Sequence, residues 1–385
     1  MGDPSRLAQW RAQPETGPRP LFFSGGSALL ETSRVLKTYT HNSIHLITPF
    51  DSGGSSAELR AAFGLLGVGD LRNRSMALAE EGSSGDPAMR ALLGHRLAAF
   101  ASRESLEAEL EALMEGEHPL IRAVDPEHMR WVCARLATFG AARPDDFDLR
   151  NASLGNLALV GSYLALERDL EAALREFGGW LGVRGLVRPS AQANAHLMVR
   201  YADGACQIGQ HRIGKTPGPG RGPIVDLELV ESLEDRSTIE VMADAASLAW
   251  IEQADLVCFP MGSFFGSVLA NFLPRGVGRA VAQQACPKVY VPNVGTDPEM
   301  EGYSLSGAVA KLLELVRRDP GAEGGSVLDA VLIDSARGEY RFALDVEEVE
   351  RLGVRVLDLE LVGSNPREHA PEKLVPLLLE LPGLV

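Results

Sequence analysis

Glycine-rich turns near the start of the sequence have the residue types that bind an anion. The first is the Ser-Gly-Gly-Ser turn at residues 24–27, which follows an apolar run at residues 20–23 and precedes a helical pattern at residues 28–40. Glycines let the main chain approach a ligand closely, and the first amides of a helix, at the positive end of its dipole, suit a phosphate. The pattern therefore favours an anion site, although glycine pairs after a strand are also common as simple turns.

A second turn follows a strand predicted at residues 43–47. It contains a single acid, Asp51, ahead of a Gly-Gly-Ser-Ser run. Further along, Gly69-Asp-Leu-Arg-Asn73 again joins glycine, acid and base, where a helix predicted at residues 71–80 begins. These segments indicate a β-α-β unit whose turns lie at the carboxyl ends of the strands, where open α/β sheets bind ligands.

A third turn of the same kind lies in the C-terminal half of the sequence. A strand predicted at residues 254–259 leads into a turn that contains Gly262, Ser263 and Ser267 and continues into a predicted helix. Turns that follow the strands of one doubly wound sheet can converge on one crevice. We therefore expect the third turn to share a phosphate-type ligand with the first two.

Two asparagines are further candidates for ligand binding. Asn293 follows a strand predicted at residues 288–291, and Asn156 begins a long helix predicted to run to about residue 177. Asparagine is also common at helix starts for reasons of capping alone. For Asn156 the structural and the functional interpretation both stay open.

These segments resemble the family of 2-phospho-L-lactate transferases, and more closely its bacterial gluconeogenesis-factor branch. That branch carries DDGGSSGRLR-like and PPGDIRN-like segments. Here the matching stretches are Asp-Ser-Gly-Gly-Ser-Ser-Ala-Glu-Leu-Arg from Asp51 and Gly-Asp-Leu-Arg-Asn-Arg from Gly69. The resemblance extends from residue 21 to about residue 315 and also covers the third turn.

The sequence departs from the family at two places. Phe50 stands where the family has the first acid of an Asp-Asp pair, which leaves Asp51 alone. In the third turn, Phe265 and Gly266 replace a tyrosine and a threonine, so two hydroxyl donors are lost. Because a lone acid makes a poorer metal site, the first departure argues against catalysis.

The resemblance implies two alternative functions. In one, Asp51 and Asp70 hold Mg²⁺ and serve as the catalytic residues of a transferase that moves a phospho-linked group from a diphosphate donor, since magnesium commonly bridges carboxylates and phosphates. In the other, the protein is a non-catalytic regulator that binds a nucleotide-sugar-like ligand. Either way, the expected partner is a small phosphorylated or nucleotide-type molecule. The expected ligand-binding residues are Ser24, Gly25, Gly26, Ser27, Gly53, Gly54, Ser55, Arg72, Asn73, Asn156, Gly262, Ser263, Ser267 and Asn293.

Composition excludes several classes of function. The chain has 385 residues and a net charge of -15, without the basic stripe that a nucleic-acid-binding protein needs. Its apolar stretches are interrupted before they reach membrane-spanning length, and the N-terminus shows no signal-peptide pattern, so we predict a cytoplasmic protein. Four widely spaced cysteines suggest neither a zinc site nor a disulfide framework.

The predicted fold class is α/β, with a Rossmann-like, doubly wound, mainly parallel sheet. Residues 1–19 are expected to form a loose leader or a strand-capping arm, and residues 20–385 a single α/β domain with a helical lobe at about residues 72–180. An Asp-Gly turn predicts a β-hairpin at residues 195–213, as an addition to the sheet. The Gly/Pro-rich run at residues 214–223 predicts a loop whose Lys215 and Arg221 could reach an anion. A homo-oligomer is a further expectation, but nothing in the sequence fixes the number of subunits.

Overall fold

The computed structural model describes residues 4–81, 85–214 and 222–381. The chain forms two compact units. The first unit comprises Met1–Phe50 and Gly185–Val385, and the second unit comprises Asp51–Arg184. The chain therefore leaves the first unit shortly after its second strand and returns to it just before the third.

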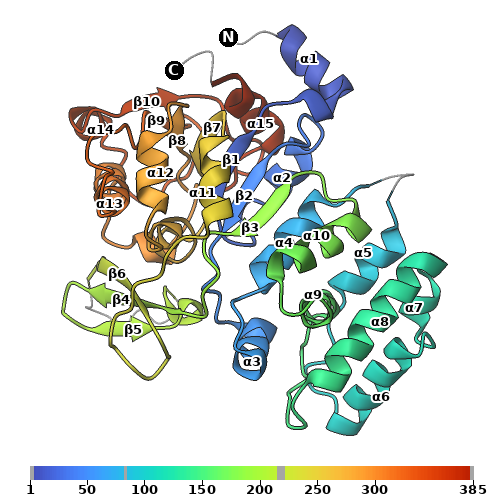
Figure 1. Cartoon of the computed structure of the whole chain (residues 1–385). Helices are drawn as coiled ribbons and strands as arrows, with labels where there is room; N and C mark the ends of the chain where they lie inside the picture. Colours follow the sequence, from blue (N-terminus) through green and yellow to red (C-terminus); the bar gives the residue numbers. More distant parts are fainter. Residues whose placement is uncertain (1–3, 82–84, 215–221, 382–385) are drawn as a thin grey trace. The chain divides into compact units, whose positions relative to one another are not determined.

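The first unit is built on a seven-stranded parallel sheet with the strand order β10-β9-β8-β7-β1-β2-β3 (Figure 1). Every neighbouring pair in this sheet is parallel. The strands are β1 (Pro20–Ser24), β2 (Ile44–Ile47), β3 (Leu186–Pro189), β7 (Leu256–Phe259), β8 (Lys288–Tyr290), β9 (Ala330–Ile333) and β10 (Arg355–Asp358). This arrangement confirms the predicted doubly wound α/β fold.

Helices cover both faces of this sheet. The helices of the first unit are α1 (Pro4–Ala12), η1 (Pro14–Thr16), α2 (Leu30–Leu36), η3 (Gln210–Arg212), α11 (Ala245–Glu252), η4 (Phe264–Val268), η5 (Leu269–Phe272), α12 (Val277–Gln283), η6 (Pro298–Met300), α13 (Leu305–Arg317), α14 (Val346–Arg351) and α15 (Pro371–Glu380). Phe22 of β1 belongs to a core with α2 and α15, whereas Leu21 and Phe23 belong to a core with α11, α12, α13 and α14. This alternation follows from the two-residue period of a strand.

The strand order reverses between β1 and β7. From β1 the chain passes through α2 to β2 on one side, whereas from β7 it passes through α12, α13 and α14 to β8, β9 and β10 on the other. Because crossovers between parallel strands are right-handed, two opposite directions of winding place their helices on opposite faces. The carboxyl ends of β1 and β7 thus form the topological switch point, where such sheets bind ligands.

The N-terminal residues add to one of these cores. Residues 4–12, for which the sequence suggested a loose leader or a strand-capping arm, form the helix α1. Its Leu7 and Trp10 pack against the core that contains α2 and α15. The C-terminal helix α15 buries Leu374, Val375 and Leu378 in the same core.

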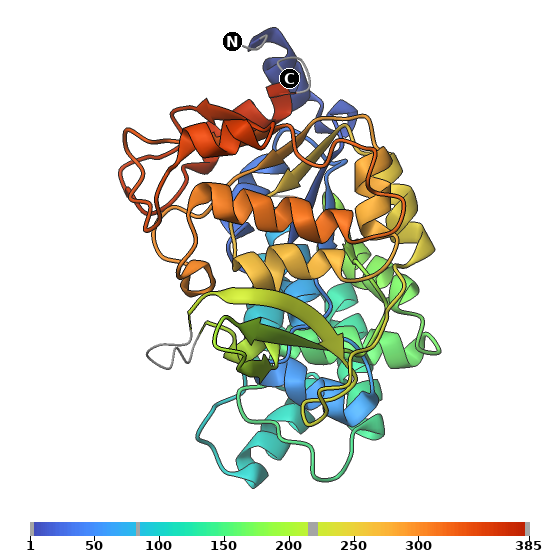
Figure 2. The same ribbon diagram turned by 90° about the vertical axis from the view of Figure 1, so that its left-hand side faces the viewer.

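A separate three-stranded antiparallel sheet belongs to the first unit. Its strands are β4 (His196–Tyr201), β5 (Cys206–Ile208) and β6 (Ile224–Val230), in the order β5-β4-β6. The predicted hairpin is present, with Gly204 at a positive φ in its turn. The expectation that it extends the parallel sheet was wrong, because β6 pairs with β4 in a sheet of its own. Leu197 and Leu227 of this small sheet belong to the same hydrophobic core as Leu21 and Phe23 of β1. Figure 2 shows the strands of this sheet, in yellow-green, below the long orange helix α13.

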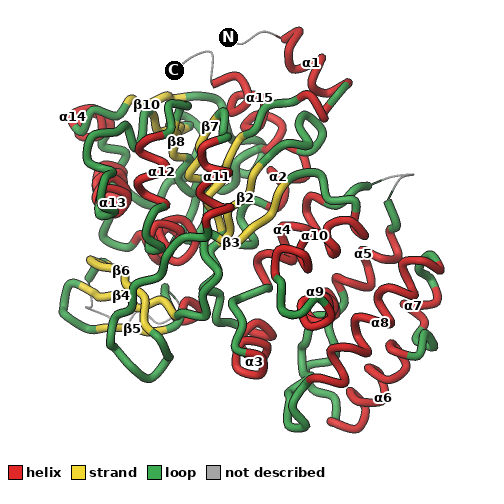
Figure 3. The backbone as a smooth tube through the Cα atoms, viewed as in Figure 1, coloured by secondary structure: helices red, strands yellow, loops and turns green. Residues whose placement is uncertain are grey.

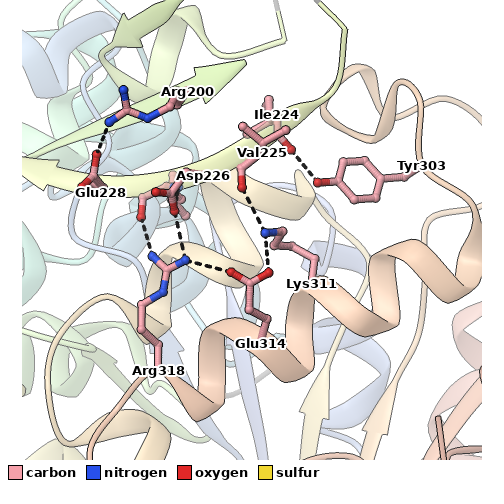
Figure 4. Close-up of polar contacts among 10 residues, drawn as sticks. Arg200, Ile224, Val225, Asp226, Glu228, Tyr303, Lys311, Glu314 and Arg318 are labelled. Atoms are coloured by element: carbon pink, nitrogen blue, oxygen red, sulfur yellow. Dashed lines mark hydrogen bonds and ion pairs between the residues drawn. The ribbon is translucent and has the colours of Figure 1, made fainter. Parts of the chain in front are cut away.

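Side chains of and near α13 cover the outer edge of β6 (Figure 4). The Tyr303 hydroxyl donates to the carbonyl of Ile224, and Lys311 Nζ donates to the carbonyl of Val225 at 3.0 Å. Arg318 forms an ion pair with Asp226 at 3.0 Å. An edge strand offers unpaired main-chain groups, and the bonds from Tyr303 and Lys311 satisfy two of its carbonyls within the chain.

The second unit is helical within residues 51–81 and 85–184, where no strand is formed (Figure 3). Its helices are α3 (Gly54–Phe63), α4 (Gly69–Leu78), α5 (Pro87–Gly94), α6 (Arg103–Met114), α7 (Pro119–Arg122), α8 (Pro126–Ala142), α9 (Leu154–Ala165) and α10 (Leu170–Leu181). Helices α8 and α9 pack closely: a Cβ on Gly161 would lie 2.0 Å from the carbonyl oxygen of Arg135. Glycine at this position therefore allows the two main chains to touch.

One helix boundary in the second unit differs from the prediction. Residues 151–177 were expected to form one helix, but α9 ends at Ala165 and α10 starts at Leu170. Between them Glu167 and Arg168 have positive φ, and Asp169 caps α10 by accepting from the amide of Ala172 at 3.0 Å. A capping aspartate and two left-handed residues end one helix and begin the next.

Candidate ligand site at the switch point and a polar cluster in the second unit

The first turn follows β1 directly. Ser24 is buried at the end of the strand, Ser27 is exposed, and the Ser27 carbonyl accepts the amide of Leu30 at 3.2 Å. The helix expected at residues 28–40 is much shorter, because α2 starts only at Leu30 and gives way to tighter turns after Leu36. A helix of seven residues contributes little dipole, so an anion here would depend on the glycine amides themselves.

The third turn follows β7 and is linked to the first. Gly262 has φ +151, and a Cβ built on it would lie 3.8 Å from Ala28 Cβ, just after the first turn, and 3.9 Å from Ser267 Cβ. Since β1 and β7 are neighbouring parallel strands, their turns leave the sheet side by side. The structure therefore brings the predicted residues of the first and third turns together at the switch point.

The helix predicted after the third turn is present, but it is not a regular α-helix. Residues Phe264–Val268 form a π-helix, and a 3-10 helix from Leu269 follows it. The cause is the Ser263 carbonyl, which accepts the amides of both Ser267 at 2.9 Å and Val268 at 3.2 Å. π-Helical turns are rare and are frequently found at functional sites.

The amides of this turn already have acceptors within the protein. Phe264 donates to Asp297 Oδ2 at 2.9 Å, and Phe265 and Gly266 donate to Glu299 Oε2 at 2.8 Å and 2.7 Å. Asn293 clamps Gly262: its Oδ1 accepts from the Gly262 amide at 3.0 Å, and its Nδ2 donates to the Gly262 carbonyl at 2.5 Å. Asn293, predicted to bind the ligand, thus holds the turn.

Asp297 and Glu299 were not among the residues predicted to bind the ligand. Glu299 is only 5 % exposed. Burial, and next the charge of Asp297, raise the pKa of Glu299 to about 8, and burial also raises the pKa of Asp297. The sequence signal for them is the Asp-Pro-Glu segment at residues 297–299, seven residues beyond the end of β8, because a proline that follows a capping aspartate is a common start of a short helix.

The second turn and its surroundings lie in the second unit. Asp51 Oδ1 accepts the amide of Gly53 at 3.1 Å, which shapes the entry into α3, and Gly54 starts that helix with φ +52. Asn156 of α9 joins two helices: its Nδ2 donates to Ser55 Oγ at 3.0 Å, and its Oδ1 accepts from Arg72 Nε at 3.0 Å. The structure therefore groups Asp51, Ser55, Arg72 and Asn156 within this unit.

Gly69 brings Asp51 close to the start of α4. Its amide donates to Ser56 Oγ at 3.2 Å, and a Cβ at this position would lie 2.5 Å from Ser56 Oγ and 2.9 Å from Asp51 Oδ2. Only glycine fits there without a shift of these groups. Asp70 and Asn73, both half-buried, lie in the first turns of α4. The two predicted acids thus occur in adjoining parts of one unit.

Three arginines give this cluster a positive character. Arg60, Arg72 and Arg74 are buried, and burial lowers the pKa of each to about 10, which leaves all three charged at neutral pH. Asp51 opposes this effect at Arg60, and Asp70 opposes it at Arg72 and Arg74. Arg60 also donates to the carbonyl of Asp51 at 3.0 Å. Of these three arginines, only Arg72 was among the residues predicted from the sequence to bind the ligand.

The two acids fit a magnesium ion only in part. No group of three or more His, Cys, Asp or Glu side chains that could hold a metal occurs among the described residues. Phe50, at the family's other acidic position, is fully buried in the core of the first unit. Mg²⁺ can be held by one or two carboxylates when phosphate oxygens and water complete its shell. Asp51 and Asp70 alone are therefore too few ligands for such an ion, and oxygens from a ligand or from water would have to complete its shell.

The predicted residues divide between the two units. Ser24, Gly25, Gly26, Ser27, Gly262, Ser263, Ser267 and Asn293 belong to the first, and Asp51, Gly53, Gly54, Ser55, Asp70, Arg72, Asn73 and Asn156 to the second. Lys215 and Arg221 lie outside the described residues. Within the part of the chain that is described, no helix combines the length and the apolar character needed to span a bilayer.

A doubly wound parallel sheet, with glycine- and serine-bearing turns at its switch point, defines the first unit as a Rossmann-like α/β fold. The comparison with protein families agrees. The profile of the family described as 2-phospho-L-lactate transferase CofD matches residues 21–362. The chain belongs to this family.

Similar proteins include several that are described as gluconeogenesis factors. The chain is 28% identical over 380 residues to a putative gluconeogenesis factor of Nostoc, covering 94% of this chain and 68% of that protein. It is 25% identical over 378 residues to the gluconeogenesis factor of Bacillus subtilis, covering 94% and 98% of the two chains. A crystal structure of a UPF0052 family protein from Bacillus halodurans superimposes with a TM-score of 0.69 at 24% identity, covering 95% of this chain and 99% of that one.

Proposed function

We propose that this protein binds a small phosphorylated or nucleotide-type ligand at the switch point between β1 and β7. The observation that carries the proposal is the adjacency of the first and third turns, with Gly262 beside Ala28 at the carboxyl ends of neighbouring strands. Membership of the transferase family supports a phosphorylated ligand. The charge of such a ligand suits main-chain amides and serine hydroxyls.

The hydrogen bonds within the third turn indicate which of its donors are available to a ligand. From Gly262 to Val268, each amide except that of Ser263 donates to an acceptor within the protein. Ser263 is half-buried, and Ser267 is 8 % exposed. The Ser263 amide and the two hydroxyls are therefore the donors that we assign to the ligand's phosphate.

Catalysis is a second step of the proposal. With a diphosphate donor, Asp51 and Asp70 would hold a Mg²⁺ ion, which supplies charge neutralisation at the phosphates. The three buried arginines of the second unit suit a ligand of high negative charge. The alternative is a regulatory protein that binds the ligand without turnover. The fully buried Phe50, in place of a second adjacent acid, favours this alternative.

A thermal-shift and calorimetric screen tests the binding. Nucleoside diphosphates, nucleotide sugars and phosphorylated acids are added with and without Mg²⁺, and a ligand at a hundred times its dissociation constant should add about 2.7 kcal/mol to stability. Ser263→Ala should lower the affinity for the compound found in the screen about tenfold, whereas Ser237→Ala, on an exposed loop, should leave this affinity unchanged.

The outcomes separate the possibilities. Stabilisation that depends on Mg²⁺ and is lost in Asp51→Asn supports the transferase, whereas stabilisation independent of Mg²⁺ supports the regulator. A screen without any stabilising compound, or a Ser263→Ala variant that binds as well as Ser237→Ala, would remove the proposed site.

A further inference from the structure

Two acidic side chains of the first unit accept main-chain amides of the third turn that would otherwise be available to an anionic ligand. Asp297 and Glu299, around the short helix η6, accept the three successive amides of Phe264, Phe265 and Gly266. Asp297 also accepts the amide of Glu299 at 3.0 Å and lies 3.3 Å from Asn293 Nδ2. One segment, residues 293–299, thus holds the whole third turn.

This arrangement is costly unless the carboxyl groups are well satisfied. An ionised carboxylate with little access to water is unfavourable, so such a group needs strong hydrogen bonds or a proton. Glu299 has two short bonds from main-chain amides, but the neighbouring charge of Asp297 opposes its ionisation. If a ligand's phosphate took over the amides of Phe265 and Gly266, the carboxyl group of Glu299 would stay buried without hydrogen-bond donors.

We propose that Asp297 and Glu299 are positioning residues of the ligand site: they fix the turn after β7 so that Ser263 presents its amide and hydroxyl to the ligand's anionic group. This inference rests on the proposed function. It assigns the amides of Phe264, Phe265 and Gly266 to holding the turn, and it removes them from the groups that contact the ligand.

Ligand binding should then be linked to a proton on Glu299. An anion bound beside this side chain disfavours its ionisation, so affinity falls as pH rises through the titration of Glu299, whose pKa lies at about 8. Among the described residues, the charged group that acts on Glu299 is Asp297. Gln210 of η3, which does not titrate, lies 3.5 Å from a Cβ built on Gly266, and Tyr290 of β8 faces Asp297, with its pKa raised by burial.

Two substitutions separate positioning from simple packing. Glu299→Gln keeps an acceptor for both amides but cannot ionise, whereas Glu299→Ala removes the acceptor. The full-length protein is titrated with UDP and GDP between pH 7.5 and pH 9, where their phosphates are fully ionised. Hydrogen exchange of peptides covering residues 264–266 is measured without ligand. Glu301→Ala, an exposed glutamate two residues away, is the matched control.

The expected results are specific for each variant. In the wild type, affinity falls roughly tenfold between pH 7.5 and pH 9, and in Glu299→Gln it stays flat. In Glu299→Ala the amides of Phe265 and Gly266, which lose their acceptor, should exchange faster, and the ligand should bind about tenfold more weakly, while the control behaves like the wild type.

Equal exchange and equal affinity in Glu299→Ala and the wild type would overturn the inference. A pH slope that persists in Glu299→Gln would overturn it as well. If the wild type binds neither nucleotide, the proposed function fails for these ligands, and hydrogen exchange still decides whether Glu299 holds the turn.

Discussion

Replacing Glu299 with glutamine should change how the stability of this protein depends on pH. Glu299 is buried, and its pKa rises from 4.5 to about 8 on folding, mainly because of burial and secondly because of Asp297. Between these two values the unfolded chain has lost the proton while the folded protein keeps it. Wild-type stability therefore falls as pH increases through this range, and the glutamine variant lacks this loss.

The size of this stability difference follows from the difference between the pKa of Glu299 in the unfolded and in the folded protein. Each pH unit corresponds to about 1.4 kcal/mol, so the interval from 4.5 to about 8 amounts to about 5 kcal/mol. At pH 4.5 both side chains are neutral, and both offer an oxygen to the amides of Phe265 and Gly266, so the two proteins should be about equally stable. At pH 8.5 the glutamine variant should be the more stable by about 5 kcal/mol.

Urea unfolding at a series of pH values from 4.5 to 8.5 measures this difference. Comparing the variant with the wild type at each pH cancels the contributions of all other titrating groups. Glu301→Gln is the control, because this exposed side chain should leave the difference flat. A flat curve for Glu299→Gln, or a wild type that gains relative stability with pH, would show that Glu299 is ionised in the folded protein and refute the reasoning.

Two further substitutions test the geometry of each unit. Gly69→Ala should destabilise the second unit by about 1–3 kcal/mol, because its Cβ would lie 2.5 Å from Ser56 Oγ; Gly94→Ala, with open space around it, should be neutral in the same unfolding experiment. Tyr303→Phe removes a hydrogen bond to the carbonyl of Ile224 and should lower the free energy of unfolding of the first unit by about 1 kcal/mol. A Gly69→Ala protein as stable as Gly94→Ala, or an unchanged Tyr303→Phe, would contradict these contacts.

The sheet could be predicted because its strands are short apolar runs bounded by glycine, proline or polar residues. The runs at residues 20–23 and 254–259 each match a strand, since burial on both faces demands mostly apolar residues. The small antiparallel sheet was only half predicted. Its hairpin has an Asp-Gly turn, but β6 follows a Gly/Pro-rich run without any local signal that it pairs with β4.

The candidate site was harder to predict than the fold. The turns themselves were recognisable from glycine and serine, which are local signals. Their acceptors were not, because Glu299 lies more than thirty residues from the amides of Phe265 and Gly266 that it binds. Equally, the buried position of Arg60 and Arg74 depends on helix packing in the second unit, which no short motif reveals.

The third turn shows why a glycine- and serine-rich turn after a strand is not by itself a phosphate site. A main-chain amide can donate strongly to only one anion, and here Asp297 and Glu299 accept the amides of Phe264, Phe265 and Gly266. A phosphate that displaced them would gain hydrogen bonds of similar strength and would leave two carboxyl groups buried without partners. The balance therefore favours a ligand that leaves the acids in place and binds through Ser263, so affinity at this turn should depend more on serine hydroxyls than on the number of glycines.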